Sequence, residues 1–134
     1  MFKLKQIYKT LSFIYNHPFN KNNKLKSLIR FLHWQLISSV KNSKHIFNWV
    51  DNTKFYLQKG EVGMTGNLYC GLVEYIEMSF ILHCLNETDH FYDIGSNVGS
   101  YTLLASGVKK CQTTTFEPIP STFSKLKENI ILNK

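Results

Sequence analysis

The spacing of apolar residues predicts two helices at the start of the chain. Residues 1–15 and 24–40 place an apolar side chain every three or four positions, as amphipathic helices do. Residues 17–23 contain Pro18 and three asparagines, which favour a loop. Trp34, in the second helix, is expected in the core. The other expected core positions are Phe2, Ile7, Leu11 and Ile14 in the first helix, and Leu25, Leu28, Ile29, Leu32, Leu36 and Ile37 in the second.

The hydrophobic period shortens after the second helix. Residues 46–50 and 54–58 are β-rich runs separated by Asp51-Asn52-Thr53, a pattern that predicts a hairpin. Three glycines then mark a loop over residues 60–66. Helical spacing returns over residues 68–85 and predicts one further helix. Its expected apolar side carries Leu72, Val73, Ile76, Phe80, Ile81 and Cys84.

Strands and helices alternate from residue 90 onward. Residues 90–94 and 112–116 read as strands, and residues 100–106 between them read as a helix that Gly107 stops. Pro118 and Pro120 open a last helix, with Phe123, Leu126 and Ile130 on one face. A β-α-β unit of this kind implies parallel strands, so the fold class is α/β. We divide the chain into a helical arm (1–45), a hairpin with a lead-in helix (46–89) and the β-α-β-α unit (90–134).

Charge is distributed unevenly along the chain. The net charge is +7, and residues 1–50 hold nine Lys or Arg and no acid, whereas residues 51–134 hold seven basic and nine acidic residues. A basic arm of this kind suits a polyanion or an anionic membrane surface, and a solvated basic face is an equal alternative. Nothing approaches 18 continuous apolar residues and no signal-peptide pattern occurs. We therefore expect a cytoplasmic protein, peripheral to the membrane at most, without a specific nucleic-acid partner.

Cysteines and histidines offer no metal site. The cysteines, Cys70, Cys84 and Cys111, are odd in number and lack CxxC spacing, so we expect buried thiols in a reducing compartment. The five histidines lack HxxxH or HExxH spacing. We assign no metal ligand and no catalytic residue.

The loop Asp93-Ile94-Gly95-Ser96-Asn97-Val98-Gly99 carries the candidate chemistry. It joins the carboxyl end of a strand to a helix, and open α/β sheets bind ligands at that edge. Gly95 permits a sharp turn, and Gly99 lets the helix start close to the strand, so that a ligand can lie against backbone N–H groups. Asn97 tolerates left-handed backbone angles, and its amide can bind a ligand.

A second acidic residue and the spacing of the glycines restrict the class of ligand that the loop can bind. Glu117 ends the next strand, 18 positions after Gly99, where nucleotide-binding units place an acceptor for ribose hydroxyls. A dinucleotide loop reads GxGxxG, whereas here the next glycine after Gly95 comes at the fifth position. Asp93 would repel a diphosphate, but it suits a zwitterion with an ammonium and a sulfonium group. S-adenosylmethionine (SAM) is such a ligand.

These segments resemble the opening of the FkbM family of methyltransferases. The resemblance covers residues 90–134, with DIGSNVGSYTLLASG followed by FEPIPSTFSKLKENIILN, and the lead-in MTGNLYCGLVE at residues 64–74. It implies a class I, Rossmann-like fold, SAM as cofactor, and O-methylation of a sugar or a similar hydroxylated small-molecule or glycan acceptor. The family's first motif falls on Asp93, Gly95, Asn97 and Gly99, and its ribose-binding acid falls on Glu117.

The class I sheet has seven strands, and about two are expected after residue 90. We therefore expect an incomplete class I SAM-methyltransferase fold, preceded by a basic helical region and a short hairpin. The chain would be a truncated or split form of the enzyme, and its methyltransferase activity stays open. Two alternatives stay open: an NAD-type dinucleotide-binding Rossmann domain, and a non-catalytic protein of membrane surfaces or polyanions. Asn67, Glu74 and Tyr101 could reach the site, but structural roles are at least as well supported.

Overall fold

The computed structural model describes residues 2–40, 43–61 and 63–134, with the side chains of residues 2, 3 and 40 excepted. The predicted core position Phe2 therefore lies outside the described side chains. The helices and strands are α1 (Phe2–Asn16), α2 (Lys24–Val40), β1 (His45–Asn48), β2 (Lys54–Leu57), α3 (Thr65–Cys70), α4 (Tyr75–Cys84), β3 (His90–Ile94), α5 (Ser100–Thr102), β4 (Gln112–Phe116) and α6 (Pro120–Ile131). Two short 3-10 turns, η1 (Pro18–Asn20) and η2 (Val50–Asn52), and a π-helical turn, η3 (Leu103–Val108), complete them.

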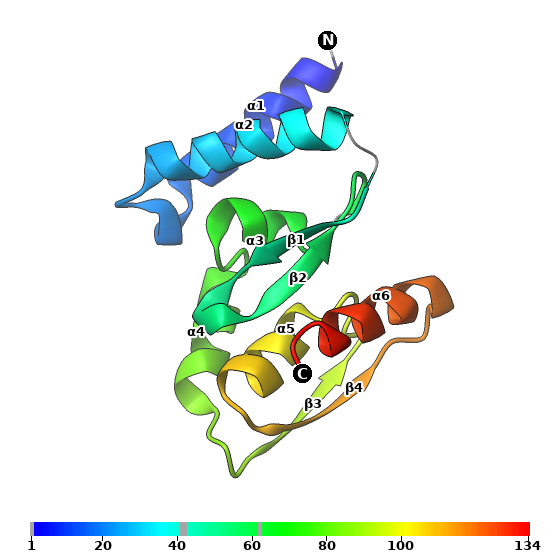
Figure 1. Cartoon of the computed structure of the whole chain (residues 1–134). Helices are drawn as coiled ribbons and strands as arrows, with labels where there is room; N and C mark the ends of the chain where they lie inside the picture. Colours follow the sequence, from blue (N-terminus) through cyan, green and yellow to red (C-terminus); the bar gives the residue numbers. More distant parts are fainter. Residues whose placement is uncertain (1, 41–42, 62) are drawn as a thin grey trace.

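The elements stack in three tiers along the molecule (Figure 1). The α1–α2 pair forms one end, α3 and the β1–β2 hairpin lie in the middle, and the β3–β4 unit with α5 and α6 forms the other end. The two pairs of strands form separate sheets. β1 and β2 pair antiparallel from His45↔Leu57 to Asn48↔Lys54, and β3 and β4 pair parallel from His90↔Gln112 to Ile94↔Phe116. The predicted hairpin and parallel unit are thus confirmed as a mixed α/β arrangement.

The helix predicted over residues 68–85 is instead two helices, α3 and α4. Gly71 breaks it with a φ of +80°, and a Cβ there would come within 2.6 Å of the Phe19 ring. The Asn67 side chain, which is buried, accepts a hydrogen bond from the Val73 N–H at 2.9 Å and holds the turn. Apolar spacing runs on through this break, so periodicity alone misses it.

Gly107 does not stop the helix after β3, as the sequence predicted. The helix continues through η3, where the Lys109 N–H donates to the Leu104 carbonyl at 3.0 Å, and the left-handed residue is Lys110, with a φ of +58°. A Cβ on Gly107 would lie 2.7 Å from the Thr53 methyl carbon. This glycine therefore allows the helix to pack closely on the hairpin.

The buried face of α2 differs from the predicted one. Trp34 is buried as predicted, together with Ser27, Phe31 and Ser38. Four of the other predicted core residues, Leu25, Ile29, Leu32 and Leu36, are instead 73%, 55%, 58% and 69% exposed. Phe31 packs edge-on to Tyr69, with ring centroids 5.2 Å apart, and Trp34 packs edge-on to Phe47 at 5.5 Å. Aromatic side chains bury large apolar areas, so these contacts favour the observed rotation of the helix.

Other predicted core positions divide between the interior and the surface. Ile14 and Leu126 are fully buried, but Ile7, Ile76, Phe80 and Phe123 are exposed.

The expectation of three buried thiols is wrong for Cys84, which is exposed, while Cys70 and Cys111 are buried. Tyr92, Ile94 and Phe116, on the parallel strands, are also exposed. No helix within the described ranges is both long and apolar enough to cross a membrane.

Candidate cofactor site

The glycine loop after β3 is held by hydrogen bonds to the end of β4. The N–H groups of Gly95 and Ser96 both donate to the Phe116 carbonyl, at 2.9 Å and 3.0 Å. The Ser96 hydroxyl donates to the same oxygen at 3.1 Å, and the Gly99 N–H donates to the Ser96 carbonyl at 2.8 Å. The loop is therefore folded back over the strand ends by its own backbone.

Three residues of the loop adopt left-handed backbone angles. The φ values are +76° at Gly95, +51° at Asn97 and +95° at Gly99. A non-glycine residue in this region is uncommon, and asparagine tolerates it better than most, as the sequence suggested for Asn97. The tight turn predicted for residues 95–99 is confirmed.

Glu117 lies against this loop, as the spacing of the two strands predicts. Its Oε2 accepts a hydrogen bond from the Asn97 N–H at 2.9 Å, and its Oε1 accepts one from the Ile119 N–H at 2.9 Å. The side chain is half-buried. Each carboxylate oxygen can accept more than one hydrogen bond, so acceptor capacity is left for a ligand.

Asp93 is the buried acid of the site. It is 7% exposed, and its Oδ2 accepts a hydrogen bond from the Thr102 hydroxyl at 2.5 Å. Burial raises the pKa of this carboxyl above its ordinary value, while the hydrogen bonds from Thr102 oppose that shift. Thr102 was not predicted as a site residue, although its position on the helix after the loop could have pointed to it.

The two glycines of the loop serve different purposes. A Cβ on Gly95 would meet no atom within 4 Å, so the space beside it is open. A Cβ on Gly99 would lie 2.6 Å from Cδ1 of Leu126, on α6. Gly99 therefore allows α6 to pack against the loop, and Gly95 leaves room for a ligand.

A cavity of about 370 Å³ opens between the loop and α4, in the range of small-molecule sites. On one side of the cavity the Tyr101 hydroxyl donates a hydrogen bond to Oε2 of Glu74 at 2.7 Å. Burial and the neighbouring Glu74 carboxylate both raise the pKa of the Tyr101 hydroxyl. The lining residues are Gly63, Val73, Glu74, Met78, Asp93, Gly95, Ser96, Asn97, Ser100 and Tyr101.

The five predicted residues are brought to one edge of the parallel sheet, but not all into one cavity. Asp93, Gly95 and Asn97 line it, whereas Gly99 and Glu117 are not among its lining residues; Gly99 packs against Leu126, and Glu117 bonds to the Asn97 N–H. Glu74 and Tyr101 also line the cavity. Asn67 does not, and its side chain instead accepts the hydrogen bond that holds the turn between α3 and α4. Among the described residues, no three His, Cys, Asp or Glu side chains gather as metal ligands would.

The sequence led us to expect that a ligand lies against the loop N–H groups, but most of these groups have partners within the protein. Those of Gly95, Ser96, Asn97 and Gly99 already donate within the protein. Phosphate groups bind to free N–H groups at such loops. Here the lining of the cavity includes Asp93 and Glu74, whose carboxyl groups suit a cationic group instead.

Fold and site together define an α/β protein in which a parallel β-α-β unit carries a glycine loop and an acid at its strand ends. Among solved structures, the chain is similar to the crystal structure of P. horikoshii TYW2 in complex with MeSAdo, with a TM-score of 0.56 and 17% identity. The similarity covers 87% of this chain and 46% of that chain, so this chain spans about half the length of the structure it matches. It shows a shared fold. No family model and no curated protein matches the sequence.

Proposed function

We propose that this chain binds SAM at the Asp93–Glu117 edge and forms the cofactor-binding part of a SAM-dependent methyltransferase with a class I, Rossmann-like fold. The observation that carries the proposal is the hydrogen bond from the Asn97 N–H to Glu117, because it joins the glycine loop to the second acid. The solved structure with a similar fold holds the SAM analogue MeSAdo, which supports a ligand of the same kind.

The chemistry of the residues present fits the cofactor. The methionine end of SAM carries an ammonium and a sulfonium group, and Asp93 and Glu74 line the cavity with carboxyl oxygens. The ribose carries two hydroxyl donors, and Glu117 is a half-buried carboxylate acceptor at the loop. Gly95 has no neighbour within 4 Å of an added Cβ and leaves room for the ligand.

The residues of this chain would bind and orient the cofactor. Asp93 and Glu74 would hold its charged end, Glu117 its ribose, and Gly95 would let the ligand approach the backbone. SAM itself supplies an activated methyl group for transfer to a nucleophile. The half-buried Tyr101, bonded to Glu74, would limit the entry of water beside the methionine end.

The acceptor follows from the motif resemblance alone. The FkbM-like motifs at residues 93–107 and 116–133 support a hydroxylated acceptor, such as a sugar or glycan, and hence O-methylation. A dinucleotide is the competing ligand for a β-α-β unit. The engaged N–H groups and the two carboxyl groups of the cavity disfavour its diphosphate.

Calorimetric titration of the chain with SAM and with NADH tests the proposal. We expect SAM to bind and NADH to bind more weakly or not at all. Glu117→Gln and Asp93→Asn should each weaken SAM binding about ten- to a hundredfold, because hydrogen bonds to charged groups contribute about 1.5–3 kcal/mol.

Glu87→Gln is the matched control, because it removes an exposed carboxylate outside the site. It should leave SAM binding unchanged. Far-UV circular dichroism checks that each variant is folded. A flat SAM titration on folded protein, or equal losses in Glu87→Gln and Glu117→Gln, would refute the proposed site.

A further inference from the structure

The helical pair leaves a stripe of apolar side chains on its surface. Leu25, Ile29, Leu32 and Leu36 follow one another at four-, three- and four-residue steps along α2, so they share one face of that helix. Each is more than half exposed. We call these four residues the α2 stripe.

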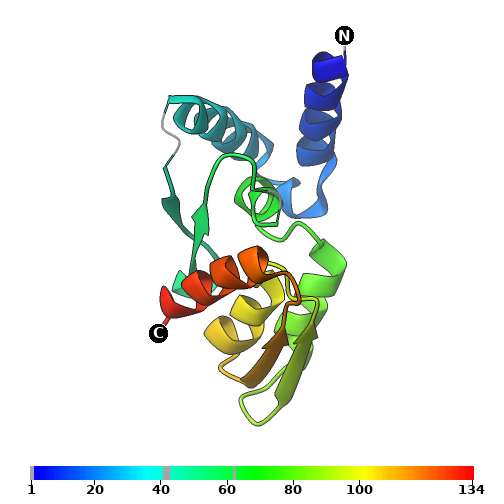
Figure 2. The same ribbon diagram turned by 90° about the vertical axis from the view of Figure 1, so that its right-hand side faces the viewer.

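The stripe continues across a groove to α1. Figure 2 shows α1 and α2 diverging from their connection, and a groove of about 610 Å³ lies between them. Leu32 of the stripe lines it, and Tyr8, on the opposite helix, is 73% exposed. The groove is lined by Tyr8, Leu11, Ser12, Tyr15, Asn16, Leu28 and Leu32. The exposed apolar surface therefore spans both helices.

Basic side chains border this apolar surface. Lys5, Lys9 and Lys26 are exposed on the same two helices, and Nζ of Lys24 lies 3.9 Å from the centroid of the Tyr15 ring. Residues 1–50 contain no Asp or Glu to neutralise these charges internally. Exposed tyrosines and leucines beside lysines are typical of helices that lie in a membrane interface.

We propose that the α1–α2 pair docks on an anionic lipid surface, with the α2 stripe and the groove rim entering the interface and the lysines contacting lipid headgroups. The excess of positive charge in the arm is complementary to such a surface. A second copy of the chain fits less well, because two acid-free basic arms would repel each other across a symmetric interface. A nucleic acid would use the charge but would leave the stripe in water.

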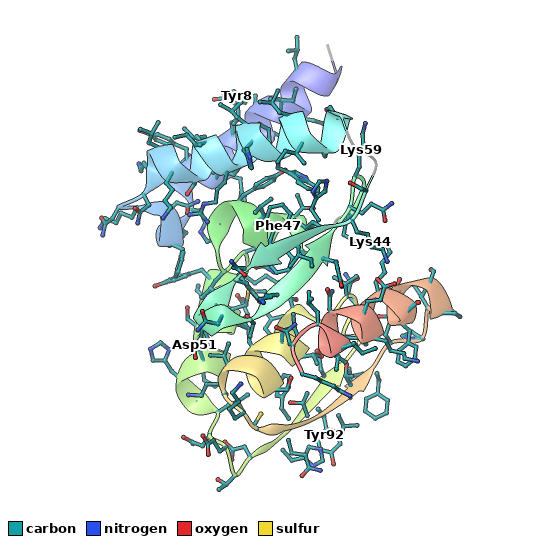
Figure 3. The ribbon with its side chains drawn as sticks, viewed as in Figure 1. Tyr8, Lys44, Phe47, Asp51, Lys59 and Tyr92 are labelled. Atoms are coloured by element: carbon teal, nitrogen blue, oxygen red, sulfur yellow. The ribbon has the colours of Figure 1, made fainter. Side chains whose placement is uncertain are left out.

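Docking in this way uses none of the residues that line the cofactor cavity. Tyr8 lies at one end of the molecule and Tyr92, on β3, lies near the other (Figure 3). None of the stripe residues lines the cavity at the glycine loop. The proposal is therefore independent of the proposed function, and either can fail alone.

Co-sedimentation with vesicles tests the proposal directly. The unmodified chain should bind phosphatidylcholine vesicles that contain phosphatidylserine, bind pure phosphatidylcholine vesicles much more weakly, and be released by salt. The triple variant Lys5→Gln, Lys9→Gln, Lys26→Gln should bind the anionic vesicles about a hundredfold less tightly at low salt. Its matched control, Lys110→Gln, Lys127→Gln, Lys134→Gln, loses the same charge from exposed lysines of residues 110–134 and should bind like the unmodified chain.

The apolar contribution has its own pair of variants. Ile29→Ser with Leu36→Ser should weaken binding about tenfold without unfolding the chain, because both side chains are exposed. Ile76→Ser with Phe80→Ser removes equally exposed apolar groups from α4 and should not. Far-UV circular dichroism checks the fold of each.

Several results would overturn the proposal. One is equal binding to neutral and anionic vesicles. Another is equal loss in a variant and its matched control. A third is a dimer, seen by sedimentation without lipid, that the Ile29→Ser, Leu36→Ser change turns into a monomer. Binding to a single-stranded oligonucleotide as tight as to the anionic vesicles, and unaffected by that change, would replace the lipid with a nucleic acid.

Discussion

Asn129 connects the glycine loop to the hairpin through one buried side chain. On α6 it is 2% exposed, its Oδ1 accepts from the Tyr56 N–H at 2.8 Å, and its Nδ2 donates to the Val98 carbonyl at 2.8 Å. Tyr56 belongs to β2 and Val98 to the loop. Replacing Asn129 with alanine would leave both backbone groups without these partners.

The size of the effect follows from those two orphaned groups. Leaving a buried donor or acceptor unpaired costs about 1–3 kcal/mol each, so Asn129→Ala should lower the free energy of unfolding by about 3 kcal/mol. For a chain of this length that corresponds to a fall in Tm of roughly 10 °C. Asn129→Asp should cost a similar amount, because it keeps the acceptor for Tyr56 but turns a carboxylate oxygen toward the Val98 carbonyl.

Urea unfolding followed by circular dichroism measures the loss. Asn133→Ala is the matched control, since Asn133 lies one turn further along the chain and bonds both backbone groups of Lys54 at 2.7 Å where water can replace it. That variant should lose less than about 1 kcal/mol. Equal losses for the two asparagines, or a loss below about 0.5 kcal/mol for Asn129→Ala, would refute the argument from buried hydrogen bonds.

Three further predictions concern the two loop glycines, the buried Asp93 and the cysteines. Gly99→Ala should destabilise the protein by about 2–4 kcal/mol, because it needs a φ of +95° and places Cβ 2.6 Å from Leu126. Gly95→Ala, with open space around it, should lose only about 1 kcal/mol in the same urea assay, and equal losses would contradict both roles. Asp93→Asn should raise the free energy of unfolding at neutral pH but not in acid. The pKa of Asp93 is raised in the fold, so its contribution is complete below the unfolded value of about 3.9 and is lost as pH rises through the folded value. If the difference in free energy of unfolding between the unmodified chain and Asp93→Asn stayed constant with pH, the predicted pH dependence would be wrong. In native buffer one thiol, that of Cys84, should react quickly with a disulfide reagent, since the other two are buried and burial raises the pKa of Cys70 to about 11; three equal rates would contradict it.

The order of elements could be predicted because each depends on local spacing. The strands at residues 90–94 and 112–116 and the second helix at 24–40 occupy the predicted ranges. The face that a helix buries depends on its neighbours instead. In α2 the leucines suggested one face, but Phe31 and Trp34 found aromatic partners on other elements and turned that face outward.

The candidate site divides in the same way. Asp93 and Glu117 could be placed at one edge from sequence, because the carboxyl ends of parallel strands meet there. The hydrogen bonds from Thr102 to Asp93 and from Tyr101 to Glu74 were not predicted, because only the position of Thr102 on the helix after the loop hinted at the first of them. Asn129 gave only a weak signal, because it is a polar residue beside the predicted apolar face of Phe123, Leu126 and Ile130.

The geometry of the glycine loop depends on few parts of the chain. Its N–H groups bond to the Phe116 carbonyl, to Ser96 and to Glu117, and its Val98 carbonyl bonds to Asn129. All of these lie within the β3–α6 unit, and only Asn129 also reaches the hairpin. If the loop is preorganised for a ligand, Asn129→Asp should therefore weaken SAM binding as well as stability, whereas Asn133→Ala should change neither much. Titration of both folded variants separates the two cases: unchanged affinity in Asn129→Asp would mean that the loop keeps its shape without this contact.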